Sequence, residues 1–537
     1  MELRLSWLCF LMSILCTTGF VRLDSHSSCF SVEQWNVFEK SFTSSFSYPN
    51  AFTGVEVDVV FQYGKTEWKV PAFWDGGRKW TVRFAPPYKG NYTFRIVCTD
   101  KANEGLNKSG FTLKVAEYKG NNPLIRHGHL RISDDQKHIE HADGSPFLWL
   151  GDTWWKCLSK RIDWEGFQEL TADRRAKGFN VVQIVCGPYP DEYMMQESWE
   201  NEGGKPYEKI DFSVVNPDYF RYADRRLRHL VGAGIVPVVV GGWGRPQAGG
   251  KSTLMQVGLD GYKRHWRNLI ARFGAYPTVW IVGGEATDGY GPWSDLARYI
   301  KDTDPFDHPL TYHAPDHPRR AIKENDVFDF DMVGIGHKGY QTAAQSLELM
   351  KSCQTAKPLR PVLCGEACYE GHMQTNFQDL QRHLFWSFML SGAAGHTYGA
   401  AGIWQASVEG DPGIAPVYDW TTWQEGMRYP GSGQLGISKR LLEQYPWQRF
   451  EPHPEWAEGC FASGIPGGVR MIYIPKRDIY DWKGIRVKDL TPGKSYTVFF
   501  FDPATGRRFT QGTVRTATGV WDSPDLPSPQ DWVLVME

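Results

Sequence analysis

Eight short apolar runs, separated by amphipathic segments, recur along the middle of the chain and limit the folds open to it. The intervening segments 220–231 and 377–388 repeat apolar residues at i, i+3, i+4 and i+7, which indicates helices with one buried face. Strands that alternate in this way with helices predict an α/β fold, a (β/α)8 TIM barrel over residues 125–445. The eight runs are 147–150, 181–185, 236–240, 278–282, 310–312, 332–335, 362–364 and 396–398.

A doubly wound open sheet also alternates strands with helices and is the alternative fold. Sheets of that kind that bind dinucleotides carry a glycine-rich loop directly after the first strand. No such loop follows the run 147–150, where the sequence continues GDTWW (151–155). The pattern therefore favours the barrel.

The segments before and after the barrel region have the short alternating runs of β-sheet proteins. Runs such as VEVDV (55–59) and YTVFF (496–500) alternate side chains with period two, and turn residues separate them from the next run. We expect an N-terminal β-sandwich at 28–118 and a small C-terminal β-sandwich at 450–537.

The first residues have the pattern of an export signal. Arg4 is followed by an uncharged apolar run, 5–16, which is too short to span a bilayer and is typical of a signal-peptide core. Small residues then predict cleavage after Gly19, so residues 1–19 are the expected signal peptide. No later apolar run is long enough for a membrane span. We therefore expect a secreted or periplasmic protein.

Composition excludes several partners and classes. The 59 basic and 61 acidic residues give a net charge of -2, which does not favour nucleic acid or an anionic membrane surface. Aromatic residues make up 14% of the chain, so it is not disordered, and the 23 Trp include candidate platforms for sugar rings. Cysteines are too sparse for a disulfide scaffold. Cys29 and Cys98 fall in one expected domain and could pair.

Two glutamates stand in the same position relative to their strands. Glu285 follows the fourth run and Glu366 follows the seventh, each directly after a glycine. Residues that follow the strands of a (β/α)8 barrel form its active site, so these two side chains are expected to share the barrel mouth. Hydrolysis of a glycosidic bond requires such a pair, one acid and one nucleophile or base. A structural ion pair is the alternative for each glutamate.

Other residues after the strands are of types that bind sugars. Aromatic side chains could stack on sugar rings, and polar side chains could hydrogen-bond hydroxyls or a carboxylate. The alternatives are core packing for each aromatic and histidine, a helix cap for Asp152, and an ordinary surface position for Arg245. The predicted substrate-binding residues are Asp152, Trp154, Tyr189, Trp243, Arg245, His313, His337, Tyr369 and Trp404.

Motifs for other chemistries are missing from the sequence. It contains no His-Glu-x-x-His zinc motif, no Gly-x-Ser-x-Gly elbow and no Gly-x-x-x-x-Gly-Lys-Ser/Thr phosphate loop. Cys364 and Cys368 have a C-x3-C spacing, but no second cysteine pair completes a zinc set. We expect no metal ion and no organic cofactor.

The middle region resembles the apiosidase-like glycoside hydrolases. The matching stretches are PFLWLGDTWW (146–155), KGFNVVQ (177–183), Gly284-Glu285 and Gly365-Glu366. The first region resembles the β-sandwich, known as DUF5060, that is often found ahead of such barrels, through VPAFWDG (70–76) and WTVRFAP (80–86). The last region resembles a module named for collagen binding in a collagenase, through FDPATG (501–506) and DWVLV (531–535). Nothing in the sequence argues for collagen binding itself.

The resemblance implies that Glu285 is the acid/base and Glu366 the nucleophile of a retaining hydrolase. Many such enzymes place an asparagine before the acid, where it contacts the sugar 2-hydroxyl, whereas this chain has Gly284. Hydroxyl recognition is then expected from Asp152 or His313. The leading hypothesis is a secreted hydrolase that cleaves an oligo- or polysaccharide of plant or algal origin and releases a furanose such as apiose, with no obligatory protein partner. The alternatives are a non-catalytic carbohydrate-binding or adhesion protein, and a polysaccharide lyase.

Overall fold

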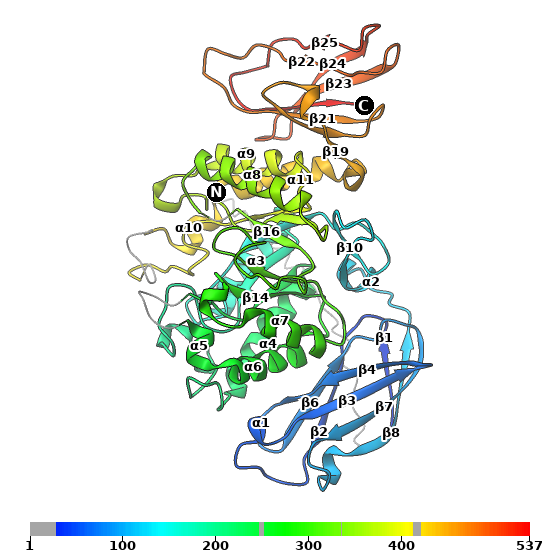
Figure 1. Ribbon diagram of the computed structural model, residues 1–537, viewed down its shortest axis with the longest axis vertical. Coiled ribbons are helices and arrows are strands. Elements are labelled where there is room, and N and C mark those ends of the chain that lie inside the picture. The colour runs from blue at the N-terminus through cyan, green and yellow to red at the C-terminus, as the bar shows by residue number, and fades with distance from the viewer. Residues whose placement is uncertain (1–27, 246–251, 335, 412–419) are drawn as a thin grey trace, which may run out of the picture.

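The computed structural model describes residues 28–245, 252–334, 336–411 and 420–537. Three bodies follow one another along the chain: an N-terminal pair of sheets, a central barrel and a C-terminal β module (Figure 1). In these ranges no helix is both long enough and apolar enough to cross a membrane. The expected signal peptide, 1–19, lies outside the described residues.

The N-terminal body is a β-sandwich with a core of aromatic rings. The ring centroid of Phe61 lies 4.1 Å from that of Phe84 and 5.0 Å from that of Phe94. Because these rings come from both sheets, the alternating pattern of each strand points one face inward. One sheet has the order β1 (Cys29–Glu33), β8 (Lys108–Ala116), β7 (Gly90–Cys98), β3 (Val57–Tyr63) and β4 (Thr66–Pro71), and the other β2 (Phe38–Thr43), β6 (Lys79–Phe84) and β5 (Phe73–Trp74).

In the described part of the chain, no disulfide joins Cys29 to Cys98. Cys29 begins β1 and Cys98 ends β7, and β8 runs between these two strands. Neighbouring strands are about 4.8 Å apart, so two strand spacings exceed the reach of a disulfide, roughly 7 Å between Cα atoms.

The central body is a (β/α)8 barrel, as the eight apolar runs predict. Its parallel strands have the order β15, β14, β13, β12, β11, β18, β17, β16. Of the described residues, none pairs β15 with β16 in a ladder; instead Asp329 N donates to Leu310 O at 2.8 Å, and Thr311 Oγ1 to Phe330 O at 2.7 Å. The strands are β11 (Trp149–Thr153), β12 (Val181–Val185), β13 (Val236–Val240), β14 (Val279–Gly284), β15 (Leu310–His313), β16 (Asp331–Val333), β17 (Val362–Cys364) and β18 (Gly395–Tyr398).

Helices cover the outside of the barrel, and their ends carry capping signals. The Asp163 side chain accepts from Gly166 N at the start of α3, and Asn216 caps α4 in the same way through Asp218 N. The segment 220–231 lies in α4, and the segment 377–388 lies in α9 except for its first residue, Phe377, which directly precedes that helix. The longer helices are α3 (Trp164–Ala176), α4 (Pro217–Gly232), α6 (Leu259–Phe273), α7 (Trp293–Thr303), α8 (Tyr340–Thr355), α9 (Gln378–Met389) and α11 (Pro430–Leu442). Shorter helices are α1 (Ala51–Gly54), α2 (Pro123–Arg126), α5 (Thr253–Val257) and α10 (Trp423–Met427), and a hairpin of β9 (Leu130–Ile132) and β10 (Ile139–His141) precedes the barrel.

The C-terminal module has a six-stranded and a two-stranded sheet around its own apolar core. Trp532 lies at the centre of this core, and its ring packs edge-on against Phe500 and Phe509. The larger sheet has the order β19 (Glu451–Pro452), β20 (Phe461–Gly464), β21 (Arg470–Ile474), β26 (Trp532–Met536), β23 (Ser495–Phe501) and β24 (Arg508–Arg515), and the smaller pairs β22 (Arg486–Val487) with β25 (Trp521–Asp522).

Buried ion pairs join each flanking body to the barrel. Arg83 of the sandwich donates from Nη1 and Nη2 to the two carboxylate oxygens of Asp224 in α4, each at 2.9 Å. Arg382 in α9 donates from Nη2 to Asp531 of the C-terminal module at 2.6 Å. These residues are all less than a tenth exposed, so the joints are packed interfaces rather than loose contacts.

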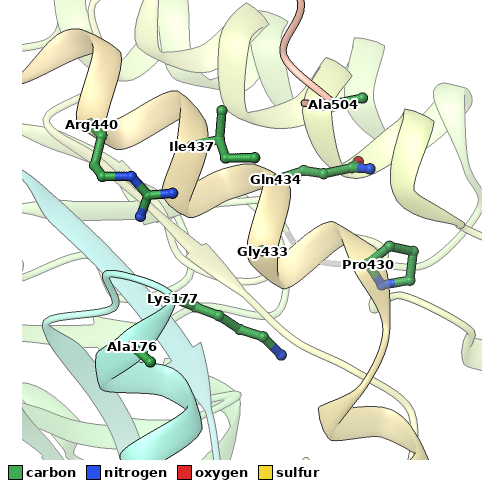
Figure 2. A pocket seen from close by; sticks show the side chains of 8 residues that line it. All are labelled: Ala176, Lys177, Pro430, Gly433, Gln434, Ile437, Arg440 and Ala504. Atoms are coloured by element: carbon green, nitrogen blue, oxygen red, sulfur yellow. The ribbon is translucent and has the colours of Figure 1, made fainter. Parts of the chain in front are cut away.

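A cavity of about 320 Å³ lies between α3, α11 and the loop that carries Ala504 (Figure 2). Lys177 reaches it from the end of α3 and Arg440 from α11 (Figure 2). None of the predicted site residues lines it. It belongs to the joint between the barrel and the C-terminal module.

Candidate active site

Glu285 stands directly after β14, where the chain turns sharply. Its φ of 47° is left-handed, a conformation that side chains other than glycine seldom adopt. The side chain is 24% exposed, and its Oε2 lies 3.7 Å from Nη1 of Arg245. Strained residues of this kind persist only where the surrounding structure fixes them, and they cluster at functional sites.

The glycine before this glutamate is required by packing. A Cβ atom at position 284 would lie 2.0 Å from a ring carbon of Trp243. Trp243 N also donates to Pro188 O at 2.8 Å, so the loop that carries the indole is anchored by its backbone. An asparagine at this position, as many barrel glycosidases have, would collide with the indole.

Glu366 follows β17 and is held by two histidines. Its Oε2 lies 2.7 Å from Nε2 of His313, and its Oε1 lies 3.6 Å from Nε2 of His337. Burial alone would raise the pKa of Glu366, but the hydrogen bonds and charges of the two histidines outweigh it and hold this pKa well below its ordinary value. The carboxyl of Glu366 is therefore ionised.

The carboxyl of Glu285 is shifted in the opposite direction. Burial raises the pKa of Glu285; the charges of His313 and Arg245 oppose this rise, and those of Asp191 and Glu366 add to it. The pKa of one carboxyl of the pair is thus raised and that of the other is lowered. Environments that separate two carboxyls in this way assign one as acid and the other as nucleophile or base.

Aromatic rings connect the two sides of this site. Trp155 Nε1 donates to the Tyr369 hydroxyl at 2.9 Å, and the ring centroids of Trp155 and Trp243 are 5.3 Å apart. His313 packs against Trp243, with centroids 5.3 Å apart, and Tyr369 lies 6.0 Å from Trp404. Trp155 is itself buried and belongs to this cluster.

Three of the predicted binding residues, Asp152, Trp154 and Tyr189, are almost fully buried. Asp152 is fully buried and its Oδ2 accepts from Arg174 Nε at 2.6 Å and from Trp154 Nε1 at 2.7 Å. Trp154 is equally buried, and Tyr189 is 1% exposed. Asp152 is not a helix cap either, because Asp163 caps α3. A carboxylate that is paired and sealed from solvent has no free acceptor for a sugar hydroxyl.

The loop after β12 contributes residues that the strand pattern does not reveal. Asp191 is solvent-exposed, has a left-handed φ of 58°, and its charge adds to the raised pKa of Glu285. Beside it, Lys156 Nζ lies 3.1 Å from Oε1 of Glu192, and both side chains are 1% exposed. This buried ion pair fixes the loop on the barrel mouth. Asp191 follows its strand by six residues, so only the cluster Pro-Asp-Glu (190–192) signals it in the sequence.

Family models match two parts of the chain. Residues 133–449 match the model described as apiosidase-like, catalytic domain. Residues 31–99 match a domain of unknown function, DUF5060. No curated protein matches the sequence.

Solved structures share the fold at low sequence identity. A candidate glycoside hydrolase from Bacteroides vulgatus is 18% identical with a TM-score of 0.72, and the match covers 94% of this chain and 99% of that one. A glycoside hydrolase family 5 member from the same organism is 19% identical with a TM-score of 0.65, covering 78% and 95%. A third structure, named glycoside hydrolase, is 20% identical with a TM-score of 0.63, covering 78% and 98%.

Proposed function

The chain belongs to the apiosidase-like family of glycoside hydrolases, and we propose that it releases a furanose such as apiose from a plant or algal polysaccharide with retention of configuration. The observation that carries the mechanism is the contrast between the two carboxyls. Glu366 is ionised beside two histidines, whereas burial favours the protonated form of Glu285.

In the first step, a Glu366 oxygen attacks the anomeric carbon while Glu285 gives its proton to the leaving oxygen. The glycosidic C–O bond breaks, an ester forms between Glu366 and the sugar, and the rest of the polymer leaves as an alcohol. In the second step, the Glu285 carboxylate takes a proton from water, whose oxygen attacks the anomeric carbon. Glu366 leaves as a carboxylate, and Glu285 is protonated again.

Recognition of the released sugar falls to the accessible polar groups of the mouth. Asp152 is sealed and His313 faces Glu366, so neither can supply the contact that Gly284 lacks. Arg245 is 62% exposed and His337 25% exposed. With the exposed Asp191, these side chains offer donors and an acceptor to hydroxyls. Many barrel glycosidases have an asparagine at the position of Gly284 that contacts the 2-hydroxyl of a pyranose. A site that lacks this contact is compatible with a furanose ring.

Incubation with apiose-containing pectic polysaccharides, followed by chromatography of the released sugars, tests the proposal. We expect free apiose from the native chain and a loss of roughly three or more orders of magnitude in turnover for Glu285→Gln and Glu366→Gln. Glu169→Gln, an exposed position on α3, is the matched control. Near-native turnover in either active-site variant would contradict the assignment, and an unsaturated product that absorbs ultraviolet light would indicate a lyase.

The stereochemistry is tested separately. Proton NMR of the first product formed should show the same anomeric configuration as the substrate. An initial product of inverted configuration would assign Glu366 as a base that activates water instead of a nucleophile.

Export is proposed from the first 19 residues. The secreted or periplasmic protein is expected to begin at Phe20, which mass spectrometry of the intact extracellular chain would detect. A chain that retains Met1 and stays in the cytosolic fraction would refute this part of the proposal.

A further inference from the structure

Three large apolar side chains are exposed in the loop between β21 and β22 of the C-terminal module. Tyr480 is 84% exposed, Ile479 57% and Trp482 41%. Other large aromatics of the module, such as Trp456 and Trp532, are buried. Leaving such side chains in water forgoes the stabilisation of burial, and exposed apolar clusters of this kind mark interaction sites.

Hydrogen bonds hold the loop in one shape. Tyr480 N donates to Asp478 Oδ1 at 3.0 Å, and Leu526 N donates to Trp482 O at 2.7 Å. Lys483 Nζ lies 2.9 Å from Oδ2 of Asp525. The backbone of the loop is therefore attached to the strand connection at 523–526, which lowers the cost of ordering it on binding.

The charges around these rings exclude a polyanionic partner. Basic and acidic side chains are equal in number, so no field of one sign attracts nucleic acid or an anionic lipid surface. Several of them pair with one another, as in Arg486 with Asp522 at 2.7 Å. The basic residues are Lys476, Arg477, Lys483 and Arg486, and the acidic residues are Asp478, Asp481, Asp522 and Asp525.

A chain of sugars matches this combination of groups. The apolar face of a sugar ring packs on an aromatic ring, while its hydroxyls accept hydrogen bonds from basic groups and donate them to carboxylates. Tyr480 and Trp482 are two residues apart, so their Cα atoms are at most about 7 Å from each other. That separation is comparable to the length of one or two sugar units along a polysaccharide.

We propose that Ile479, Tyr480 and Trp482 form an anchoring surface that binds a polysaccharide chain outside the active site. The sheet β22–β25, which borders this loop, lies on the side of the C-terminal module that faces away from the barrel (Figure 1). The surface is thus separate from the barrel mouth that carries Glu285 and Glu366. It keeps the barrel close to an insoluble polymer while the active-site residues act on that polymer. The choice of polymer rests on the proposed function.

A pull-down of the full-length chain with insoluble plant cell-wall polysaccharide tests the anchor. We expect Tyr480→Ala/Trp482→Ala to bind about tenfold or more weakly than the native chain. Tyr480→Ala alone, which removes the most exposed ring, should lose part of this binding. Phe46→Ala, a 43% exposed aromatic position on the N-terminal sandwich, is the matched control and should bind as the native chain does. Turnover of a soluble oligosaccharide should not change in any of these variants.

The outcomes separate the anchor from the proposed function. Undiminished binding in the double variant would overturn the anchor. A native chain that sediments as a dimer, together with a double variant that sediments as a monomer, would also overturn it, because the loop would then bind a second copy. Ring-dependent binding by a chain that hydrolyses no glycoside would support the anchor and refute the proposed function. Equal melting temperatures of all variants would show that lost binding does not come from unfolding.

Discussion

At the scale of single residues, His313 lowers the pKa values of both catalytic candidates. Its charge lowers the pKa of Glu366 and opposes the rise in the pKa of Glu285. The proposed mechanism requires Glu366 ionised and Glu285 protonated, so activity is expected to be lost as the pH falls through the pKa of Glu366 or rises through the pKa of Glu285. His313→Gln raises both values, and we expect both limbs of the pH profile of kcat/KM to move to higher pH. His127→Gln, which alters the distant pair with Asp143, should leave the profile in place. An unmoved acid limb in His313→Gln would show that this histidine does not control Glu366.

The indole of Trp243 packs directly against Gly284 at the end of β14, which leaves no room for a side chain there. A single methyl group, in Gly284→Ala, would overlap that ring. We expect the free energy of unfolding to fall by about 1–3 kcal/mol, with a loss of turnover because Trp243 also packs on His313. Gly232→Ala, at a position where a Cβ meets nothing within 4 Å, serves as the control in urea denaturation and should not be destabilised. Native stability of Gly284→Ala would mean that the indole moves aside freely.

At the scale of elements, a buried ion pair fastens the first barrel strand to the first barrel helix. Asp152 on β11 and Arg174 on α3 are both fully buried and 2.6 Å apart. Arg174→Met leaves the carboxylate without its partner, and we expect a loss of about 3–5 kcal/mol in the free energy of unfolding. Asp152→Asn/Arg174→Met removes both charges and should recover part of the loss. Arg175→Met, one residue along on the exposed face of the helix, should be close to neutral in the same urea titration. If Arg174→Met is no less stable than Arg175→Met, the ion pair does not fasten these elements.

The sequence predicts the elements well and individual side-chain directions less well. Strand and helix positions follow from local periodicity, and the places of Glu285 and Glu366 follow from the strand ends. Asp152 lies near the end of β11, inside the strand. Its partner Arg174 comes from the following helix, and no local pattern reveals that contact. Asp191 lies in a loop without periodicity, so the prediction omits it.

At the scale of the whole molecule, the three bodies depend on their joints. Asp531 accepts from Arg382 in α9 and from the Tyr473 hydroxyl, at 2.6 and 3.2 Å. Asp531→Asn leaves the buried guanidinium without a charged partner, so we expect the C-terminal module to detach more often and to be cleaved faster near 443–452 in limited proteolysis. Asp134→Asn, whose side chain is 92% exposed, should be cleaved at the native rate. Equal rates would show that the apolar contacts alone hold the module.

Glu366 has a second role, because β15 and β16 are not paired in a ladder among the described residues. His313 ends β15 and His337 lies in the loop after β16. The carboxylate of Glu366 contacts both histidines and so connects two strands that no ladder among the described residues joins. Esterification of Glu366 in the proposed mechanism removes the negative charge that faces His313 and His337. The contact between these two edges would then weaken during the step in which water must reach the intermediate, and it would be restored when the free carboxylate returns. The Glu366 side chain would then serve both the reaction and the contact between β15 and β16.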